Sequence, residues 1–413
     1  MVIQGVYFVL LGRHLGAHGY GLFAGAVAFV FILAPFAGLG SSNVLIMNVA
    51  RNPAVFPVYW GKCLLTLGVS GTFFTLITWR VGSIFLPNVP MTLLVSLAIA
   101  EFFFGRAAEA SGQAFQAFER LKTTAQINVF LGMARLAGVL GFSVSSSRTP
   151  EMWGLWYLGS TAFVGFISIL WVSRVLGLPR ITVPTRLDFR LGFHFALGLA
   201  SSTMYADIDK TMLTRMGTPE AAGVYAAAYR AIVMALSPIS SLFRATYARF
   251  FRQGVEGLRG CLDLAFRLMP FTVLYGLASF LLLFFLAPWA PLIMGQDFQA
   301  AVGALRLLAP LPLIDGIYYL GGNVLTGAGY VKVRSYLQLL VAILNVVLNL
   351  YLIPRWSWMG AGWASLVTDG ALALSVWTAI AFLIVRSKSS GKEEANRESS
   401  SLRSNISSPW PSA

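Results

Sequence analysis

Long apolar stretches recur along almost the whole chain, and they limit what it can fold into more than any other feature. A helix needs about 20 mostly apolar residues to cross the hydrocarbon core of a bilayer, which is about 30 Å thick. Of the 413 residues, 57% are hydrophobic and only 11% are charged, against roughly 25% charged residues in an average soluble domain. So few charges cannot cover a water-facing surface, and we therefore predict an all-α polytopic membrane protein.

We predict about twelve transmembrane helices, arranged as two lobes of six. The expected helices lie at residues 1–12, 21–48, 62–86, 91–117, 126–146, 152–173, 191–214, 220–243, 262–293, 299–323, 333–353 and 360–385. The domains that follow are an N-terminal lobe over 1–174, a cytoplasmic linker over 175–190, a C-terminal lobe over 191–385 and a disordered cytoplasmic tail over 386–413. The first helix would be only about 18 Å long, so we expect it to be truncated and to continue upstream of Met1.

The basic residues test this arrangement, because cytoplasmic loops of membrane proteins retain Lys and Arg. Most loop cations fall on one side of the membrane, and the other side carries only Arg13, Arg80, Arg148, Arg215 and Arg355. We therefore expect both termini to be cytoplasmic and the protein to lie in a bacterial inner membrane. The net charge of +14 is then explained by topology, and we predict no nucleic-acid partner. The tryptophans near outward helix ends, including Trp153 and Trp289, are predicted to anchor the protein at the membrane interface.

The two lobes repeat a short pattern. Arg13 is followed by Gly21-Leu22-Phe23-Ala24, and Arg215 is followed at the same spacing by Gly223-Val224-Tyr225-Ala226. Six helices separate the two copies, so both lobes have the same orientation. Parallel repeats about an axis along the membrane normal are an architecture of transporters.

Three segments resemble the polysaccharide biosynthesis, or oligosaccharide flippase, family of the MOP exporter superfamily. They are Arg13-His14-Leu15-Gly16-Ala17-His18-Gly19-Tyr20-Gly21-Leu22-Phe23, then Asp209-Lys210 with Gly223-Val224-Tyr225, and then Asn345 and Asn349 with Ile353-Pro354 and Gly360-Ala361. The resemblance runs from Arg13 to about Arg386, and the short first helix departs from it.

This resemblance implies a function and a shape. Members move a polyprenyl-diphosphate-linked oligosaccharide from the cytoplasmic to the periplasmic leaflet by alternating access, for the synthesis of O-antigen, capsule or exopolysaccharide. It implies a V-shaped structure like that of the MATE transporters and a coupling ion, H+ or Na+. A polysaccharide polymerase or ligase is a further expected partner.

Ionisable residues at membrane depth are the candidate site, because a charge at mid-bilayer costs at least about 2.5–3.5 kcal/mol unless it faces a cavity or a partner. The cations expected to line a lumen and bind the substrate are Arg106, Arg135, Lys210 and Arg230. The acidic residues expected to pair with them or to carry the coupling ion are Glu101, Asp207, Asp209, Asp315 and Asp369. Arg13 is a candidate gating residue.

Matched depths on adjacent helices predict two ion pairs, Glu101 with Arg135 and Asp207 with Arg230. These pairs either lock the helices together or belong to a cationic lumen for a lipid-linked diphosphate, and the sequence leaves both open. Arginine suits the second role because its planar fork can bind phosphate oxygens bidentately.

Other classes of function are less consistent with the residues. His14 and His18 lie four apart, but no carboxylate or cysteine nearby completes a metal site, and we expect neither metal nor cofactor. The short outward loops and the lack of a phosphate-binding glycine loop argue against an enzyme, such as a membrane glycan polymerase or ligase. A MOP-type exporter of a drug or of the peptidoglycan lipid precursor remains the closest alternative. Intramembrane arginines favour an anionic substrate.

Overall fold

The computed structural model describes residues 2–406, which form helices joined by short loops and, within this range, contain no strand. Nine helical stretches of the described residues are long and apolar enough to cross a membrane. The prediction of an all-α polytopic membrane protein is therefore confirmed. Two of these stretches contain kinks, and the number twelve stays a prediction.

The first half of the chain forms helices that begin and end at recognisable signals. They are α1 (Val2–Ala37), α2 (Ser41–Val49), α3 (Phe56–Phe85), α4 (Met91–Ile99), α5 (Arg106–Ala117), α6 (Leu121–Ser143) and α7 (Pro150–Val175), with the π-helical segment η2 (Ala100–Gly105) between α4 and α5 and a short 3-10 turn, η1 (Pro53–Val55), before α3. At the start of α7, the Thr149 hydroxyl accepts a hydrogen bond from the Met152 amide and Pro150 occupies the first position. The threonine hydroxyl satisfies one of the free amides at the helix N-terminus, and the proline has no amide hydrogen to satisfy.

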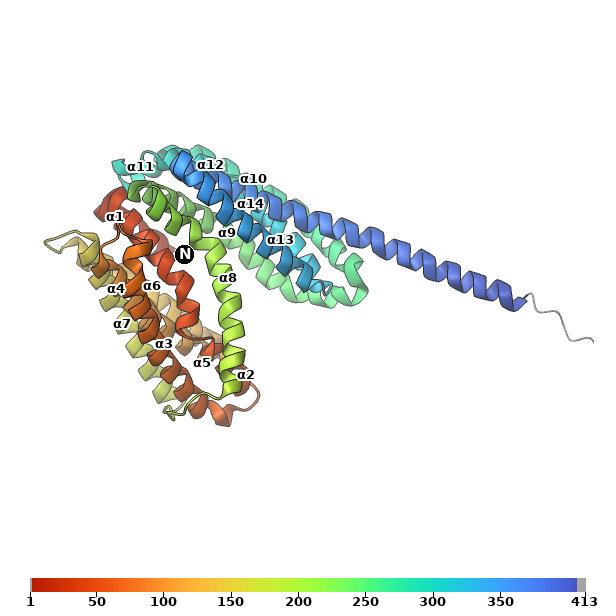
Figure 1. Ribbon diagram of the computed structural model, residues 1–413, viewed down its shortest axis with the longest axis horizontal. Coiled ribbons are helices and arrows are strands. Elements are labelled where there is room, and N and C mark those ends of the chain that lie inside the picture. The colour runs from red at the N-terminus through yellow and green to blue at the C-terminus, as the bar shows by residue number, and fades with distance from the viewer. Residues whose placement is uncertain (1, 407–413) are drawn as a thin grey trace, which may run out of the picture. The chain divides into compact units, whose positions relative to one another are not determined.

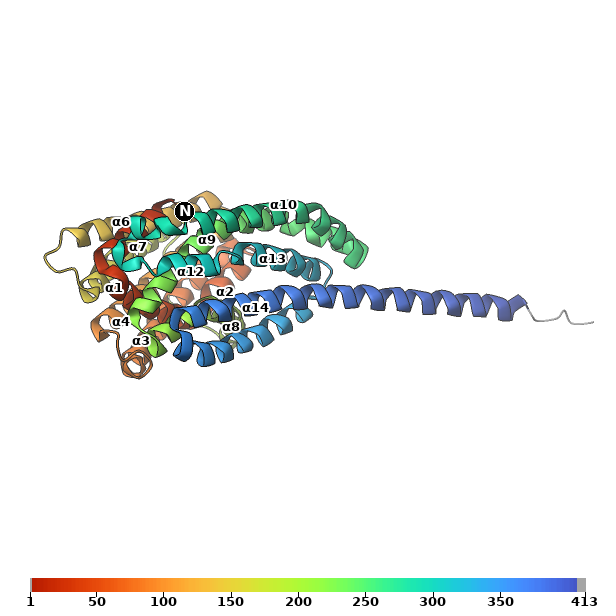
Figure 2. The same cartoon turned by 90° about the horizontal axis from the view of Figure 1, so that it is seen from above.

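The second half continues with longer helices. They are α8 (Arg186–Met216), α9 (Pro219–Gln253), α10 (Gly257–Leu286), α11 (Ala290–Met294), α12 (Ala301–Leu308), α13 (Leu311–Gly327) and α14 (Val331–Ile406), with 3-10 turns at η3 (Gly254–Glu256), η4 (Ala287–Trp289) and η5 (Gln296–Phe298). α14, drawn in blue in Figures 1 and 2, is interrupted at Ser357, whose φ of 51° is not helical. Its apolar part, Val331–Val385, is long enough for two crossings.

Some segments predicted to lie outside the helices are helical in the structure. The predicted loop between residues 12 and 21 is helical except at Gly16, where a φ of 64° kinks α1, because glycine adopts this conformation without a steric cost. The segment 386–406 continues α14, where we expected disorder. Lys, Glu, Arg and Ala are good helix formers, and they extend a helix that is already nucleated. Residues 407–413 lie outside the described residues.

By their internal contacts the residues form two compact units. The first comprises Met1–Met234, Leu283–Leu308 and Asn345–Ala364, and the second comprises Ala235–Leu282, Ala309–Leu344 and Ser365–Ala413. The predicted division of the sequence into lobes at 175–190 stays a prediction.

Within the first unit, α1 crosses α9 at two glycines. A Cβ atom added to Gly21 would overlap the carbonyl oxygen of Pro219, and one added to Gly223 would overlap the carbonyl oxygen of Ala17. These are the glycines at equivalent positions of the sequence repeat. Small residues let helix backbones approach closely in membranes, where packing drives helix association.

The connection before α8 is fastened to the start of α3, also in the first unit. The Arg180 amide donates to the Pro57 carbonyl at 2.8 Å, and the Lys62 ammonium lies 2.7 Å from a carboxylate oxygen of Asp188. Asp188 and Thr185 form a capping box at the N-terminus of α8. Burial opposes ionisation of Asp188, but hydrogen bonds from Lys62 and Thr185 lower the pKa of its carboxyl below the ordinary value.

The glycine crossing predicts a specific loss of stability. In Gly21→Ala the new methyl group meets backbone, which cannot move aside as a flexible side chain can, so we expect destabilisation by about 1–3 kcal/mol. Unfolding of the purified protein by SDS titration measures this. Gly68→Ala on α3 is the matched control, because its Cβ has no heavy atom within 4 Å. Equal stability of the two variants would contradict the close crossing.

The Lys62–Asp188 pair is expected to make a pH-dependent contribution to the free energy of unfolding. A group with a lowered folded-state pKa stabilises the protein above its unfolded pKa, and the contribution is lost as pH falls through the folded pKa. We therefore expect Asp188→Asn to destabilise the protein at pH 7 by about 1–3 kcal/mol, and the difference from wild type to shrink below about pH 4. SDS titrations at several pH values test this. Asp263→Asn, an exposed carboxylate on α10, is the control and is expected to show neither effect.

Candidate functional site

A buried carboxylate in η2 is held by two other helices of the first unit. Arg135 on α6 donates from its Nη2 to Glu101 Oε1 at 2.5 Å, and the Tyr157 hydroxyl on α7 donates to the same oxygen. The Arg135 guanidinium also lies 4.6 Å from the centre of the Tyr157 ring. Glu101 is only 6% exposed. This predicted ion pair is confirmed, and it ties three helices together through one carboxylate oxygen.

The backbone around Glu101 is itself unusual. Residues Ala100–Gly105 form a π-helical segment, a feature that is found mostly as single-turn bulges and frequently at functional sites. The second carboxylate oxygen of Glu101 lies over Gly105, where an added Cβ would be 2.5 Å away. Any other residue at position 105 would therefore displace the carboxylate that binds Arg135.

A second cluster of the same composition lies on α8 and α9. The Lys210 ammonium is 2.9 Å from Asp207 and 3.4 Å from Asp209, and it lies 4.1 Å from the centre of the Tyr229 ring. The Tyr225 hydroxyl donates to Asp209. Asp209 and Lys210 are both almost fully buried. Each cluster thus combines a carboxylate, a cation over a tyrosine ring and a tyrosine hydroxyl.

The predicted pair of Asp207 with Arg230 is wrong. Asp207 pairs with Lys210 instead, because side chains three residues apart on one helix are neighbours. Arg230 lies 4.0 Å from the centre of the Phe8 ring and interacts electrostatically with Tyr20. Among the described residues, no carboxylate lies within ion-pair distance of its guanidinium. Arg230 therefore keeps an uncompensated positive charge beside α1.

Tyr7 on α1 is near enough to both arginines to feel their charge. It interacts electrostatically with Arg135, Arg230 and Glu101, and its side chain is buried with no hydrogen-bond partner for the hydroxyl among the described residues. A buried hydroxyl without a partner costs about 1–3 kcal/mol. Tyr7 is thus a polar group of α1 available to a bound ligand.

Aromatic rings support this part of α1. Trp153 is fully buried, and its ring centroid lies 5.8–5.9 Å from those of Tyr7, Phe23 and Tyr157. The prediction that Trp153 anchors the protein at the membrane interface is therefore wrong, since the residue belongs to the core. Trp289 is 59% exposed, which leaves the anchor prediction open for that residue.

The other candidate residues have local partners. Arg106 is 2.8 Å from Glu109, one turn away on α5. Arg13 donates to the Leu292 and Ile293 carbonyls, at 2.8 and 2.6 Å, and so closes the last turn of α11. In the second unit, Asp315 on α13 and Asp369 on α14 lie close enough to interact electrostatically.

No metal centre is found in the described part of the chain, where no three His, Cys, Asp or Glu side chains gather. His18, which we considered with His14, is paired with Glu220 at the start of α9.

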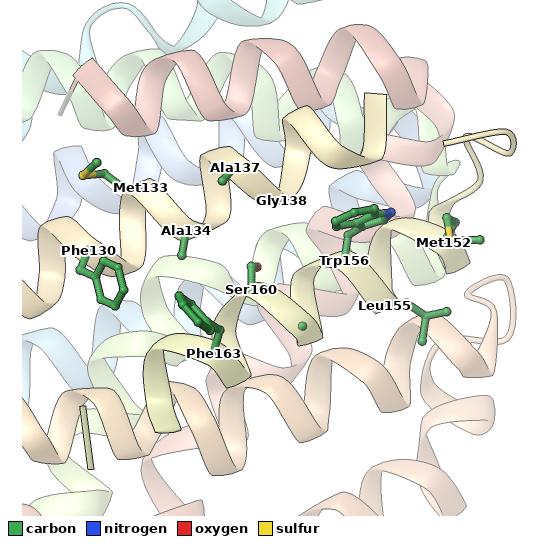
Figure 3. Close-up of a pocket in the computed structure, with 11 residues that line it drawn as sticks. Phe130, Met133, Ala134, Ala137, Gly138, Met152, Leu155, Trp156, Ser160 and Phe163 are labelled. Atoms are coloured by element: carbon green, nitrogen blue, oxygen red, sulfur yellow. The ribbon is translucent and has the colours of Figure 1, made fainter. Parts of the chain in front are cut away.

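One hollow in the first unit is an apolar groove of about 730 Å³ between α6 and α7. Figure 3 shows its wall of Phe130, Met133, Trp156 and Phe163 around small residues such as Ala137. It carries no charged side chain, and its walls belong to two membrane-spanning helices. The groove is therefore a lipid-facing surface, and the charged clusters lie elsewhere.

Comparison with known proteins places the fold. Over 94% of this chain and 96% of the other, the structure is similar to an inward-facing multidrug resistance MATE family transporter of the MOP superfamily, with a TM-score of 0.78 and 15% identity. The lipid II flippase MurJ matches with a TM-score of 0.74 and 12% identity, over 91% of this chain and 86% of that one. A MOP superfamily transporter from Pyrococcus furiosus matches with a TM-score of 0.63 and 16% identity, over 92% of this chain and 93% of that one.

The fold and the buried charges thus define a polytopic helical membrane protein with the fold of the MOP superfamily transporters. A family model described as polysaccharide biosynthesis protein matches residues 1–253. The chain belongs to this family. An uncharacterised membrane protein of Methanocaldococcus jannaschii is 36% identical over 84 residues, which is 20% of this chain and only 19% of that protein.

Sequence reasoning found the charged residues but missed most of their partners. Tyr157, Tyr225 and Tyr229 contact the predicted charges, yet tyrosine in an apolar helix is usual and gave no signal by itself. Because these tyrosines lie at about the same membrane depth as the charged residues, the sequence could have suggested them as partners. Tyr225 follows directly in the repeat pattern that we singled out, Gly223-Val224-Tyr225-Ala226.

The Glu101–Arg135 pair predicts a characteristic mutational pattern. Arg135→Gln leaves a buried carboxylate without its cation and should cost about 3–5 kcal/mol, whereas the double variant Glu101→Gln, Arg135→Gln removes both charges and should recover part of that loss. SDS titration of the four proteins gives the coupling energy. Additive losses would show that the two side chains do not stabilise each other. Arg80→Gln, an exposed cation on α3, is the control for loss of charge alone.

Proposed function

We propose that the protein flips a polyprenyl-diphosphate-linked oligosaccharide from the cytoplasmic to the periplasmic leaflet by alternating access, for the synthesis of a surface polysaccharide such as O-antigen, capsule or exopolysaccharide. The bacterial inner membrane, with both termini in the cytoplasm, is the proposed location. Membership of the polysaccharide biosynthesis family and the fold of the MOP transporters support this. The observation that carries it is Arg230, whose positive charge has no carboxylate partner among the described residues.

A diphosphate needs such a charge on its way across the membrane. Attraction between opposite charges is strongest where water is excluded, and a guanidinium can bind two phosphate oxygens at once. Arg230 offers its fork beside Tyr7, whose buried hydroxyl can donate one more hydrogen bond. The Phe8 ring holds the guanidinium in place before a ligand arrives.

In this proposal, the cations that are paired with carboxylates also bind the substrate. Glu101 neutralises Arg135 when no substrate is bound, and Asp207 and Asp209 do the same for Lys210. A diphosphate would compete with these carboxylates for the cations. The cost of an unpaired charge in the bilayer is thereby avoided in the empty protein. Arg106, paired with Glu109, completes the proposed set of substrate-binding cations, and Arg13, which holds α11, is proposed to act at the gate.

The coupling ion belongs to the second unit in this proposal. Asp315 and Asp369 lie near each other, and two carboxylates in one site cannot both ionise without a counter-charge. A proton or Na+ would supply that charge. We therefore propose that these two residues carry the coupling ion.

The proposal predicts loss of transport on neutralising Arg230. In vesicles that contain the purified protein and a fluorescent polyprenyl-diphosphate-linked oligosaccharide, we expect Arg230→Gln to lower the rate of translocation about 10- to 100-fold, since a charge-assisted contact in a dry site is lost. Quenching from outside the vesicle measures the rate. Arg80→Gln should transport normally. If Arg230→Gln and Arg135→Gln both transport normally at normal expression, the cationic pathway is wrong.

A membrane glycan polymerase or ligase is separated from a flippase by the sidedness of the lipid-linked glycans after deletion of the gene. Loss of translocation leaves complete units facing the cytoplasm. An enzyme that acts later leaves them in the outer leaflet, unpolymerised or unattached. A drug or peptidoglycan-precursor exporter would leave the surface polysaccharide intact.

A further inference from the structure

One end of α8 carries a row of basic side chains that belongs to neither buried cluster. Arg186, Arg190 and His194 follow one another at intervals of four residues, so each is rotated by only about 40° from the last and all three lie on one face of the helix. All three side chains are exposed. None is in an ion pair with another described residue, in contrast to Arg135 and Lys210.

The same face of α8 is also apolar. Together with Leu187, Phe189 and Phe193, the two arginines and the histidine line a hollow of about 730 Å³, which we call the α8 hollow. The two phenylalanines are 54% and 41% exposed, although burial is usual for such side chains. Phe193 is positioned by α1, since its ring lies 6.3 Å from that of Phe36.

The positive charge of the hollow is not cancelled by the acidic residue nearby. Asp188 lies two residues before Arg190, but its carboxylate is occupied by the Lys62 ammonium and by the capping box with Thr185. The hollow therefore presents two guanidinium groups and an imidazole, with aromatic rings beside them. The first turn of α8 is already capped, so these side chains, and not the helix end, would hold a ligand.

We propose that the α8 hollow receives the diphosphate and the first isoprene units of the lipid-linked substrate at the cytoplasmic face, before translocation. This inference rests on the proposed function and on the predicted orientation, in which residues 175–190 are cytoplasmic. Two arginines match the two phosphates, because each fork binds phosphate oxygens bidentately. The exposed phenylalanines match a hydrocarbon chain at the level of the headgroups, where aromatic side chains are favoured.

The position of the hollow on α8 fits a loading site. Arg190 and Lys210 belong to the same helix and are separated along its axis by about 30 Å, the thickness of the hydrocarbon core. One helix thus joins an exposed cationic surface to the buried Asp207–Lys210 cluster. The fastening of the preceding segment to α3, through Arg180 and Pro57, fixes where α8 begins.

The test is a binding measurement on the full chain in phosphatidylcholine nanodiscs, with polyprenyl diphosphate as the probe and native mass spectrometry as the readout. Arg186→Gln with Arg190→Gln should weaken binding about tenfold or more, and added salt should weaken wild-type binding. The matched control removes two exposed cations from another predicted cytoplasmic loop, Arg120→Gln with Lys122→Gln, and should bind as wild type does. Equal loss in the control would overturn the proposal.

Competing ligands identify which part of the probe is recognised. Inorganic diphosphate and uncharged polyprenol should each compete poorly. Equal competition by phosphatidylglycerol would overturn the proposal in favour of a general contact with anionic lipid. Equal binding of inorganic diphosphate would overturn it in favour of a soluble anion. Phe189→Ala, which leaves both arginines in place, should weaken binding of the polyprenyl probe alone.

Transport kinetics separate this inference from the proposed function. In the vesicle assay the Arg186, Arg190 double variant should raise the apparent KM and leave kcat unchanged, whereas Arg230→Gln should lower kcat. If wild type transports but the double variant has a normal KM, the loading site is wrong and the flippase proposal stands. If wild type does not transport and the hollow still binds polyprenyl diphosphate selectively, the flippase proposal fails and the binding site stands.

Discussion

The structure depends above all on how charge is held inside a helical membrane protein. Glu101 shows the constraint most directly, because one of its carboxylate oxygens is bound by Arg135 and by the Tyr157 hydroxyl while the other lies over Gly105. Without these partners an ionised carboxylate at this depth would cost several kcal/mol. The π-helical segment around it, the small residue beside it and the aromatic packing behind it all serve the same carboxylate.

Arg230 is the contrasting case. Its guanidinium is held by aromatic side chains of α1, which attract a cation but do not cancel its charge. Paired cations therefore make the empty protein stable, whereas Arg230 leaves a positive potential for an anionic ligand. The α8 hollow has the same character at the exposed end of its helix, where water and salt reduce the strength of the attraction but not its sign.

The sequence predicted the class of fold and one buried pair because both depend on simple periodicities. The length of the apolar stretches predicts the membrane-spanning helices, and Glu101 and Arg135 could be paired from their expected depth in the membrane alone. Asp207 shows why the rest was harder, since depth fits Arg230 whereas the three-residue spacing on α8 fits Lys210, and the structure selects Lys210. The kink at Gly16 and the π-helical segment change rotation without changing composition. Trp153 likewise has an interfacial position in the sequence but a core position in the structure.

The contact between Gly21 and Gly223 has a consequence for how this chain can diverge. When two residues at equivalent positions of a repeat contact each other, they lie at a pseudo-twofold axis. The same geometry holds in the self-complementary interface of a symmetric dimer. In a true dimer one substitution at such a site changes both subunits at once. Within a single chain each glycine is encoded separately, so a bulkier residue can enter α1 or α9 alone. The site where the two repeat-equivalent glycines meet can therefore become unequal by a single change.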